Sequence, residues 1–250
     1  MAIRWTTAFW DLPAEGFEDS VAFWLKATGS TLSPSFGPGG DFATLIPAEG
    51  DSCLRVQRVR EGKGGNHFDL SVDDVEADAE RALGLGATVV HQEPGFVVLR
   101  SPGGFAFCLV GHRTVKRAPA PVTWPGGSRS TADQITLDIP PQAFDHELAF
   151  WQTLTGWPQS HSESPEFRRL LPPPELPLRF LLQRLDVAEK GQTTTAHIDL
   201  SCSDVDAETE RHVALGAKAV RRHHFWQVMR DPAGLVYCNT DNDPDRRLAP

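Results

Sequence analysis

The sequence predicts an α+β protein of two tandem domains, each made of two β-α-β-β-β modules. Two repeats carry this prediction. The stretch 57–75, QRVREGKGGNHFDLSVDDV, returns at 183–205 as QRLDVAEKGQTTTAHIDLSCSDV. Upstream, the segment 22–29, AFWLKATG, returns at 149–156 as AFWQTLTG. Two long copies at such a wide spacing indicate a duplicated domain rather than a short-repeat solenoid.

The composition is that of an ordinary globular protein, with 250 residues, 40% hydrophobic content and a formal net charge of −9. The negative charge argues against nucleic acid or an anionic membrane as the main partner. The first residues, MAIRWTTAFWDL, lack the apolar core of a signal peptide, and no stretch is long enough to span a membrane. Four cysteines without a CxxC pair predict reduced thiols in a cytoplasmic protein.

In the first domain, apolar spacing and Gly or Pro breaks predict each element in order. A strand over 5–12 precedes a helix over 16–27, which Gly29 ends. Asp73 or Asp74 caps a second helix that runs to Leu85. The remaining strands are expected at 31–36, 42–47, 52–59, 67–72, 88–91, 95–100 and 105–110.

The second domain repeats this pattern, with helices expected near 143–154 and 204–215. Between the copies lies RAPAPVTWPGGSRS, whose prolines, glycines and serines are typical of a linker. Trp124 in this run is large enough that we expect it to dock. The predicted organisation is therefore domain 1 at 1–113, a linker at 114–131, domain 2 at 132–242 and a tail at 243–250.

Each copy of the repeated strand has a polar face. His67 and Asp69 lie on one face of the first copy, and His197 and Asp199 on the same face of the second, because side chains alternate along a strand. Two interpretations remain open: either the His is a general base oriented by the Asp, or the pair is a structural hydrogen bond.

These motifs resemble the vicinal-oxygen-chelate superfamily, which includes glyoxalase I, bleomycin-resistance proteins and extradiol dioxygenases. AFWLKATG, the HFDLSVDD strand and the PGGFAFCL turn look like actinobacterial-type glyoxalase-like domains. The resemblance covers nearly the whole chain outside the linker. It implies a curved mixed sheet with a concave cavity in each domain, and it leaves the activity open because the superfamily has many functions.

Superfamily enzymes hold a divalent metal with ligands from the first and last strands of each module. The resemblance places His67, His197, Gln57, Gln183, Thr7 and Gln134 at such positions. Where a Glu is usual, this sequence has Ala106 and Val236. With one His and one neutral amide in each domain, the sequence predicts no metal and no other cofactor.

Other side chains are candidates for contact with a ligand. Phe9 and Trp226 are expected as walls of an apolar pocket. Cys108 and Cys238 alternate with apolar residues on the last strand of each domain, so they either line the cavity or simply pack in the core.

Two functions follow from these residues. The first is a metal-free binding protein for a small, partly aromatic organic molecule. The second is a glyoxalase-like lyase or isomerase with a His/Asp general base, with or without a divalent metal, in which Gln57 or Gln183 polarises a carbonyl. The sequence favours a monomer or homodimer.

Overall fold

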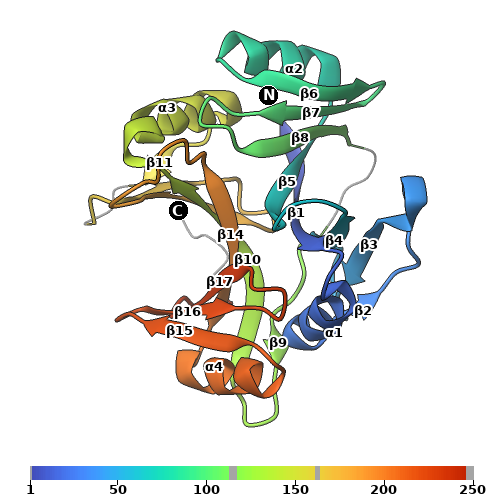
Figure 1. The fold of residues 1–250 in the computed structure, drawn as a ribbon, viewed down its shortest axis with the longest axis vertical. Helices are drawn as coiled ribbons and strands as arrows, with labels where there is room; N and C mark the ends of the chain where they lie inside the picture. Colours follow the sequence, from blue (N-terminus) through green and yellow to red (C-terminus); the bar gives the residue numbers. More distant parts are fainter. Residues whose placement is uncertain (1, 113–116, 161–163, 246–250) are drawn as a thin grey trace. The chain divides into compact units, whose positions relative to one another are not determined.

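A computed structural model describes residues 2–112, 117–160 and 164–245 (Figure 1). The first repeat forms two successive modules of one strand, one helix and three strands, with a short 3-10 turn η1 in the first. The elements are β1 (Ile3–Pro13), α1 (Phe17–Thr28), β2 (Thr31–Leu32), η1 (Pro38–Gly40), β3 (Phe42–Ile46), β4 (Leu54–Val59), β5 (Gly65–Val72), α2 (Val75–Gly84), β6 (Thr88–Glu93), β7 (Phe96–Arg100) and β8 (Ala106–Gly111).

The second repeat has the same order of elements and a short extra strand before it. The elements are β9 (Val122–Thr123), β10 (Arg129–Ile139), η2 (Pro141–Ala143), α3 (Phe144–Thr155), β11 (Gln159–Ser160), β12 (Phe167–Leu170), β13 (Arg179–Arg184), β14 (Thr195–Cys202), α4 (Val205–Ala214), β15 (Lys218–Arg222), β16 (Trp226–Arg230) and β17 (Val236–Thr240).

Each repeat makes one mixed sheet, which confirms the predicted α+β fold of two tandem β-α-β-β-β pairs. The strand orders are β2-β3-β4-β1-β5-β8-β7-β6 and β11-β12-β13-β10-β14-β17-β16-β15, and β9 pairs with β10. The first and last strands of the second and fourth modules pair in parallel, β5 with β8 and β14 with β17. The strand expected at 31–36 ends at Leu32, because Pro34 has no amide proton for the sheet.

Local signals place the helix ends. Gly29 takes a left-handed conformation at φ 64° and ends α1. Asp74 caps α2 by accepting a hydrogen bond from the backbone N–H of Ala77, as the sequence predicts. In the predicted linker, the indole of Trp124 donates to Ser130, so Trp124 does dock. The domain boundaries remain a prediction, and part of the linker and most of the tail lie outside the described residues.

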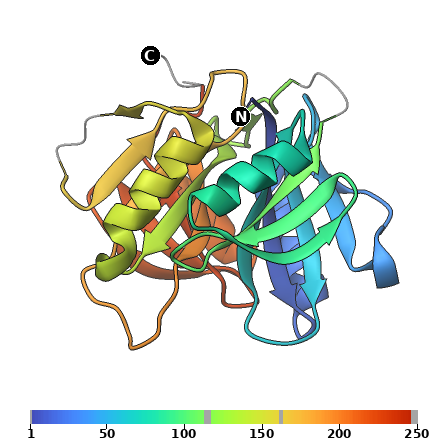
Figure 2. The same ribbon diagram turned by 90° about the horizontal axis from the view of Figure 1, so that it is seen from above.

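The chain divides into two compact units, and each unit draws on both repeats. The first unit comprises Met1–Ala8, His67–Lys116 and Ile135–Ala196. In Figure 2 its helices α2 (green-cyan) and α3 (yellow) lie side by side, and Arg81 of α2 donates to the carbonyl of Thr153 in the last turn of α3. The buried Trp151 packs its ring 5.3 Å from Phe68 and 4.9 Å from Phe107.

The second unit comprises Phe9–Asn66, Arg117–Gln134 and His197–Pro250. Its core repeats the same scheme around Trp24, which stacks on Trp10 at 4.0 Å and meets the edge of Tyr237 at 4.9 Å. Arg211 of α4 donates to the carbonyls of Lys26 and Ala27 at the end of α1. Each core therefore requires a helix from one repeat and a β-α-β-β-β module from the other.

No helix among the described residues is long and apolar enough to cross a membrane.

Candidate functional site

In the second repeat, β14 and β17 bring three potential metal ligands together. Alternation places His197 and Asp199 on one face of β14, and the parallel register sets Asp199 opposite Cys238 of β17. The His Nε2 lies 3.2 Å from Asp199 Oδ1, and Cys238 Sγ lies 3.6 Å from the same nitrogen. All three residues are buried. The strand register therefore builds a compact cluster of one nitrogen, one oxygen and one sulfur.

A fourth buried residue supports this cluster. The Nε2 amide of Gln134, on β10, donates a hydrogen bond of 2.6 Å to Asp199 Oδ2. The other carboxylate oxygen, Oδ1, faces His197. Gln134 therefore contacts the cluster through Asp199, as a residue that fixes the orientation of a ligand does.

The first repeat places an equivalent set on β5 and β8. Asp69 lies opposite Cys108 in the parallel register, and His67 shares the face of Asp69. The ligand atoms of His67, Asp69 and Cys108 all lie within 4.8 Å of one another, as do those of the second cluster. The first cluster is looser: His67 Nε2 lies 4.0 Å from Asp69 Oδ1, and the His side chain is 12% exposed, against 7% for His197.

The two contacts of His197 distinguish a metal site from a nucleophile. In a Cys–His–acid relay, the thiol and the carboxylate bind opposite nitrogens of the imidazole ring. Here Asp199 and Cys238 both approach Nε2, so the three donor atoms converge on one region. This arrangement favours joint ligation of an ion over proton relay from the thiol.

The donor set fits a divalent ion of the zinc type. Zinc accepts imidazole nitrogen, carboxylate oxygen and thiolate sulfur, and three protein ligands leave a fourth position for substrate or water. Two ligands about 2.1 Å from one ion, at a tetrahedral angle, lie about 3.4 Å apart. The 3.2 Å and 3.6 Å separations around His197 Nε2 bracket this distance.

The other predicted site residues lie on other strands of the two sheets. Phe9 is on β1 with the guanidinium carbon of Arg55 5.6 Å from its ring, and Gln57 on β4 pairs with Phe42. Thr7 is buried on β1. Gln183 on β13 pairs with Phe167, and Trp226 on β16 stacks on His223 with ring centroids 4.4 Å apart. Their roles in binding stay predictions.

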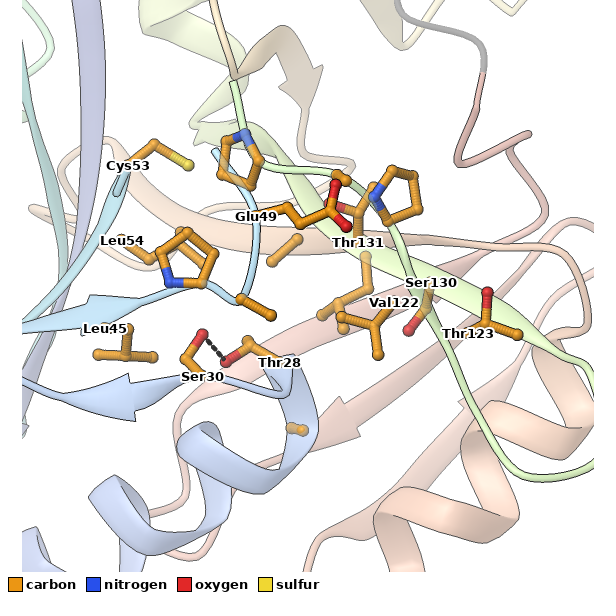
Figure 3. A pocket seen from close by; sticks show the side chains of 18 residues that line it. Thr28, Ser30, Leu45, Glu49, Cys53, Leu54, Val122, Thr123, Ser130 and Thr131 are labelled. Carbon is orange, nitrogen blue, oxygen red and sulfur yellow. Dashed lines mark hydrogen bonds between the residues drawn. The ribbon is translucent and has the colours of Figure 1, made fainter. Parts of the chain in front are cut away.

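A cavity of about 320 Å³ lies away from these clusters (Figure 3). It is bounded by the end of α1, the β3–β4 segment, the prolines of the linker and the start of β10. Thr28 and Ser30, which share a hydrogen bond of 2.9 Å, lie on one wall, with Glu49 and Cys53 on others. Leu200 reaches this cavity from the apolar face of β14, opposite His197. None of the predicted site residues lines it.

Behind β17, a buried polar network joins the linker to α4. Glu208 accepts hydrogen bonds from Ser130 and Arg211, and His212 lies between Glu208 and the hydroxyl of Tyr237. Burial acts to raise the pKa of Glu208, but hydrogen bonds from His212, Arg211 and Ser130 outweigh it and lower the pKa to about 2. Burial lowers the pKa of His212 and raises that of Tyr237. These groups are structural, because they hold α4 against β17.

Solved structures of the same fold include several dioxygenases. A mutant of 4-hydroxymandelate synthase from Streptomyces coelicolor is 14% identical, with 96% of this chain and 93% of that chain covered and a TM-score of 0.62. The 2,2',3-trihydroxybiphenyl 1,2-dioxygenase of Sphingomonas wittichii strain RW1 is 13% identical, with 96% and 90% covered and a TM-score of 0.61. A halotolerant catechol dioxygenase is 15% identical, with 95% and 86% covered and a TM-score of 0.59. No curated protein sequence matches the chain.

The prediction that neither domain holds a metal is wrong, because each repeat brings a possible metal-ligand cluster together. It rested on the apolar residues Ala106 and Val236, where a Glu was expected. Two residues further along the same strands, Cys108 and Cys238 each supply a donor, and an Asp on the neighbouring strand supplies the carboxylate. An alternating Cys in a strand looks like a core residue, so the sequence did not distinguish the ligand from packing.

The sequence model of the glyoxalase-like domain family matches residues 8–110 and again 134–240. These two matches coincide with the two sheets, and each contains one His–Asp–Cys cluster. The chain therefore belongs to the glyoxalase-like domain family of the vicinal-oxygen-chelate superfamily, with two copies of the domain in tandem.

Proposed function

We propose that this chain binds a divalent metal ion with His197, Asp199 and Cys238, and that it is a glyoxalase-like lyase or isomerase acting on a small organic molecule. The observation that supports this most directly is the convergence of Asp199 and Cys238 on one nitrogen of His197. The cluster is buried, so the ligands are shielded from competing water.

The donor set favours non-redox chemistry. Oxygen-activating iron sites commonly use two His and one carboxylate, whereas this cluster has one His, one carboxylate and a thiol. A zinc-type ion supplies Lewis-acid polarisation of a substrate oxygen when bound. His197 and Asp199 then act as ligands rather than as a general base and its orienting acid.

A group of aromatic side chains is the argument for a partly aromatic ligand. Phe9, Phe36 and Phe42 gather on β1, β3 and the loop before it, where Phe36 and Phe42 stack at 5.8 Å. The guanidinium carbon of Arg55 lies 5.4 Å from the Phe36 ring, which is 40% exposed. Aromatic faces beside a cation and the amide of Gln57 suit a flat molecule that carries an acceptor or a negative charge.

Metal content and thermal shift test this proposal together. Purified protein is analysed for bound metal, and its melting temperature is measured with zinc, cobalt(II), nickel, manganese and iron(II). We expect near-stoichiometric metal and a raised melting temperature, both reduced in His197→Ala and Cys238→Ser. Cys202→Ala is the matched control, because Cys202 lies on the other face of β14 and bonds to the carbonyl of Leu200. If the wild type neither contains nor responds to any of these ions, the proposal is wrong.

A further inference from the structure

The two metal-ligand clusters have the same three residue types but different neighbours on the adjoining strand. Gln134 on β10 and Thr7 on β1 occupy equivalent positions, 127 residues apart, the same spacing as Phe23 and Phe150. Both are buried, Gln134 at 3% exposure and Thr7 at 5%. A Gln side chain is two atoms longer than Thr and carries an amide donor. The repeats therefore differ in the length and hydrogen-bonding groups of the side chain at this position.

This difference in side chain coincides with a difference in the geometry of the two clusters. Gln134 Nε2 binds Asp199 Oδ2 at 2.6 Å, and Oδ1 of the same carboxylate lies 3.2 Å from His197 Nε2. In the first repeat, the corresponding distance from Asp69 Oδ1 to His67 Nε2 is 4.0 Å. With one oxygen of Asp199 held by the amide, the other is oriented toward the remaining ligands. The second cluster thus has close to the spacing that a tetrahedral ion requires, and the first cluster must contract to reach it.

We infer that Gln134 is a positioning residue that makes the cluster of His197, Asp199 and Cys238 the tighter of two metal sites in this chain. The inference rests on the proposed function and deepens it: the two sites bind the same class of ion with unequal affinity. A partner that orients a metal ligand contributes about 10- to 100-fold to affinity. The cluster of His67, Asp69 and Cys108, with its more exposed imidazole, is the weaker and more readily exchanged site.

Zinc titration of the metal-stripped full-length chain, followed by calorimetry, measures both sites. The wild type is expected to show two classes of site. Cys238→Ser should abolish the tight class and Cys108→Ser the weak one. In the Cys108→Ser background, where one site remains, Gln134→Thr installs the residue of the other repeat and is expected to weaken zinc binding about 10-fold or more. Cobalt(II) absorption reports in the same samples whether a thiolate is still a ligand.

The reciprocal change tests the same residue by gain of function. In the Cys238→Ser background, Thr7→Gln is expected to strengthen zinc binding at the first cluster. Because both positions are buried, circular dichroism and melting temperature are used to establish that each variant is folded. If Gln134→Thr unfolds, Gln134→Met replaces it, since Met keeps the length of the side chain and lacks the amide donor. Two equal sites in the wild type, or a folded Gln134 variant with unchanged affinity, would overturn this inference and leave the proposed function standing. A wild type that binds no zinc at either site would overturn the proposed function itself.

Discussion

The indole of Trp24 donates a hydrogen bond of 2.9 Å to Asp231, a residue 207 positions further along the chain. The equivalent indole, that of Trp151, donates at the same distance to Glu147, four residues earlier in its own helix. Both carboxylates are buried, and both also accept backbone N–H groups of the turn before the last strand, Gly103 for Glu147 and Leu235 for Asp231. In one core the acid that accepts from the indole is on a helix, as Glu147 of α3. In the other core it is in the turn between two strands, as Asp231 between β16 and β17.

The positions without an acid carry serine. Ser20 of α1 corresponds to Glu147 of α3, and Ser101 of the β7–β8 turn corresponds to Asp231 of the β16–β17 turn. If α3 packed against the β16–β17 turn, two acids would be buried together. If α1 packed against the β7–β8 turn, the indole would meet only serine hydroxyls and no carboxylate. Burying two like charges is costly, so this placement selects which helix pairs with which turn.

The buried acids give a first stability prediction. Glu147→Gln presents an amide donor to either the Trp151 indole or the Gly103 amide, so one hydrogen bond is lost and two donors meet. We expect a loss of about 1–3 kcal/mol in the free energy of unfolding, measured by urea denaturation. Asp231→Asn should cost a similar amount for the same reason. Glu80→Gln, exposed on α2, is the control, and an equal loss there would count against the explanation.

The turn beside Glu147 gives a steric prediction. A Cβ atom on Gly103 would clash with Thr194 Oγ1 and would lie 2.8 Å from Glu147 Cγ. The equivalent residue of the other repeat is Ala233, where the helix has the smaller Ser20 in place of Glu147. Gly103→Ala is therefore expected to destabilise the protein by about 1–3 kcal/mol through overpacking. Gly65→Ala, where a Cβ meets open space, should change stability little. Thermal unfolding of both variants tests this prediction. Equal melting temperatures would show that a Cβ at position 103 does not overpack the core.

Glu208 contributes to the way the free energy of unfolding depends on pH at low pH. Its pKa is about 2 in the folded protein against an ordinary value of 4.5, so the ionised form stabilises the fold. The contribution is fully present above pH 4.5 and is lost as the pH falls toward 2; it is on the order of 3 kcal/mol. In Glu208→Gln, the dependence of unfolding free energy on pH should flatten over this interval. Glu210→Gln on the exposed side of α4 should keep the wild-type slope.

Glu147 and Asp231 act in the opposite direction. Burial raises the pKa of each carboxyl in the folded protein, so the stability that the protonated form provides is lost as the pH rises through the raised value. Burial also lowers the pKa of His212, because it disfavours the charged imidazolium. The stability that the neutral imidazole provides is therefore lost as the pH falls below 6.5.

Docking of the linker gives the fourth prediction. The guanidinium carbon of Arg211 lies 3.6 Å from the Trp124 ring centroid, and the indole donates to Ser130 at 2.8 Å. Trp124→Ala removes both contacts and is expected to cost about 1–3 kcal/mol. Trp124→Phe keeps a ring under Arg211 and should recover part of that loss. Chemical denaturation measures both, and identical values for the two variants would mean that the ring contact contributes nothing.

The sequence predicts the helix ends and the order of the modules, and it does not predict which distant side chains come into contact. The Asp74 cap, the Gly29 helix end and the repeat of β-α-β-β-β modules each depend on residues close in the chain. The metal-ligand clusters depend on the register of β14 against β17, which no local pattern specifies. The Trp24–Asp231 bond likewise joins residues whose separation leaves no periodic signal.

Because each core is assembled from both sequence repeats, the covalent connection between the repeats serves mainly as a tether. A chain nicked between β8 and β9 would yield two fragments that each lack half of both cores, so they are expected to remain associated as a heterodimer rather than separate into independent domains. Expressed apart, each half would expose the face of its helix and Trp24 or Trp151 to water until it found its complement. The tether raises the effective concentration of one half near the other, and an intermolecular assembly thereby becomes an intramolecular one.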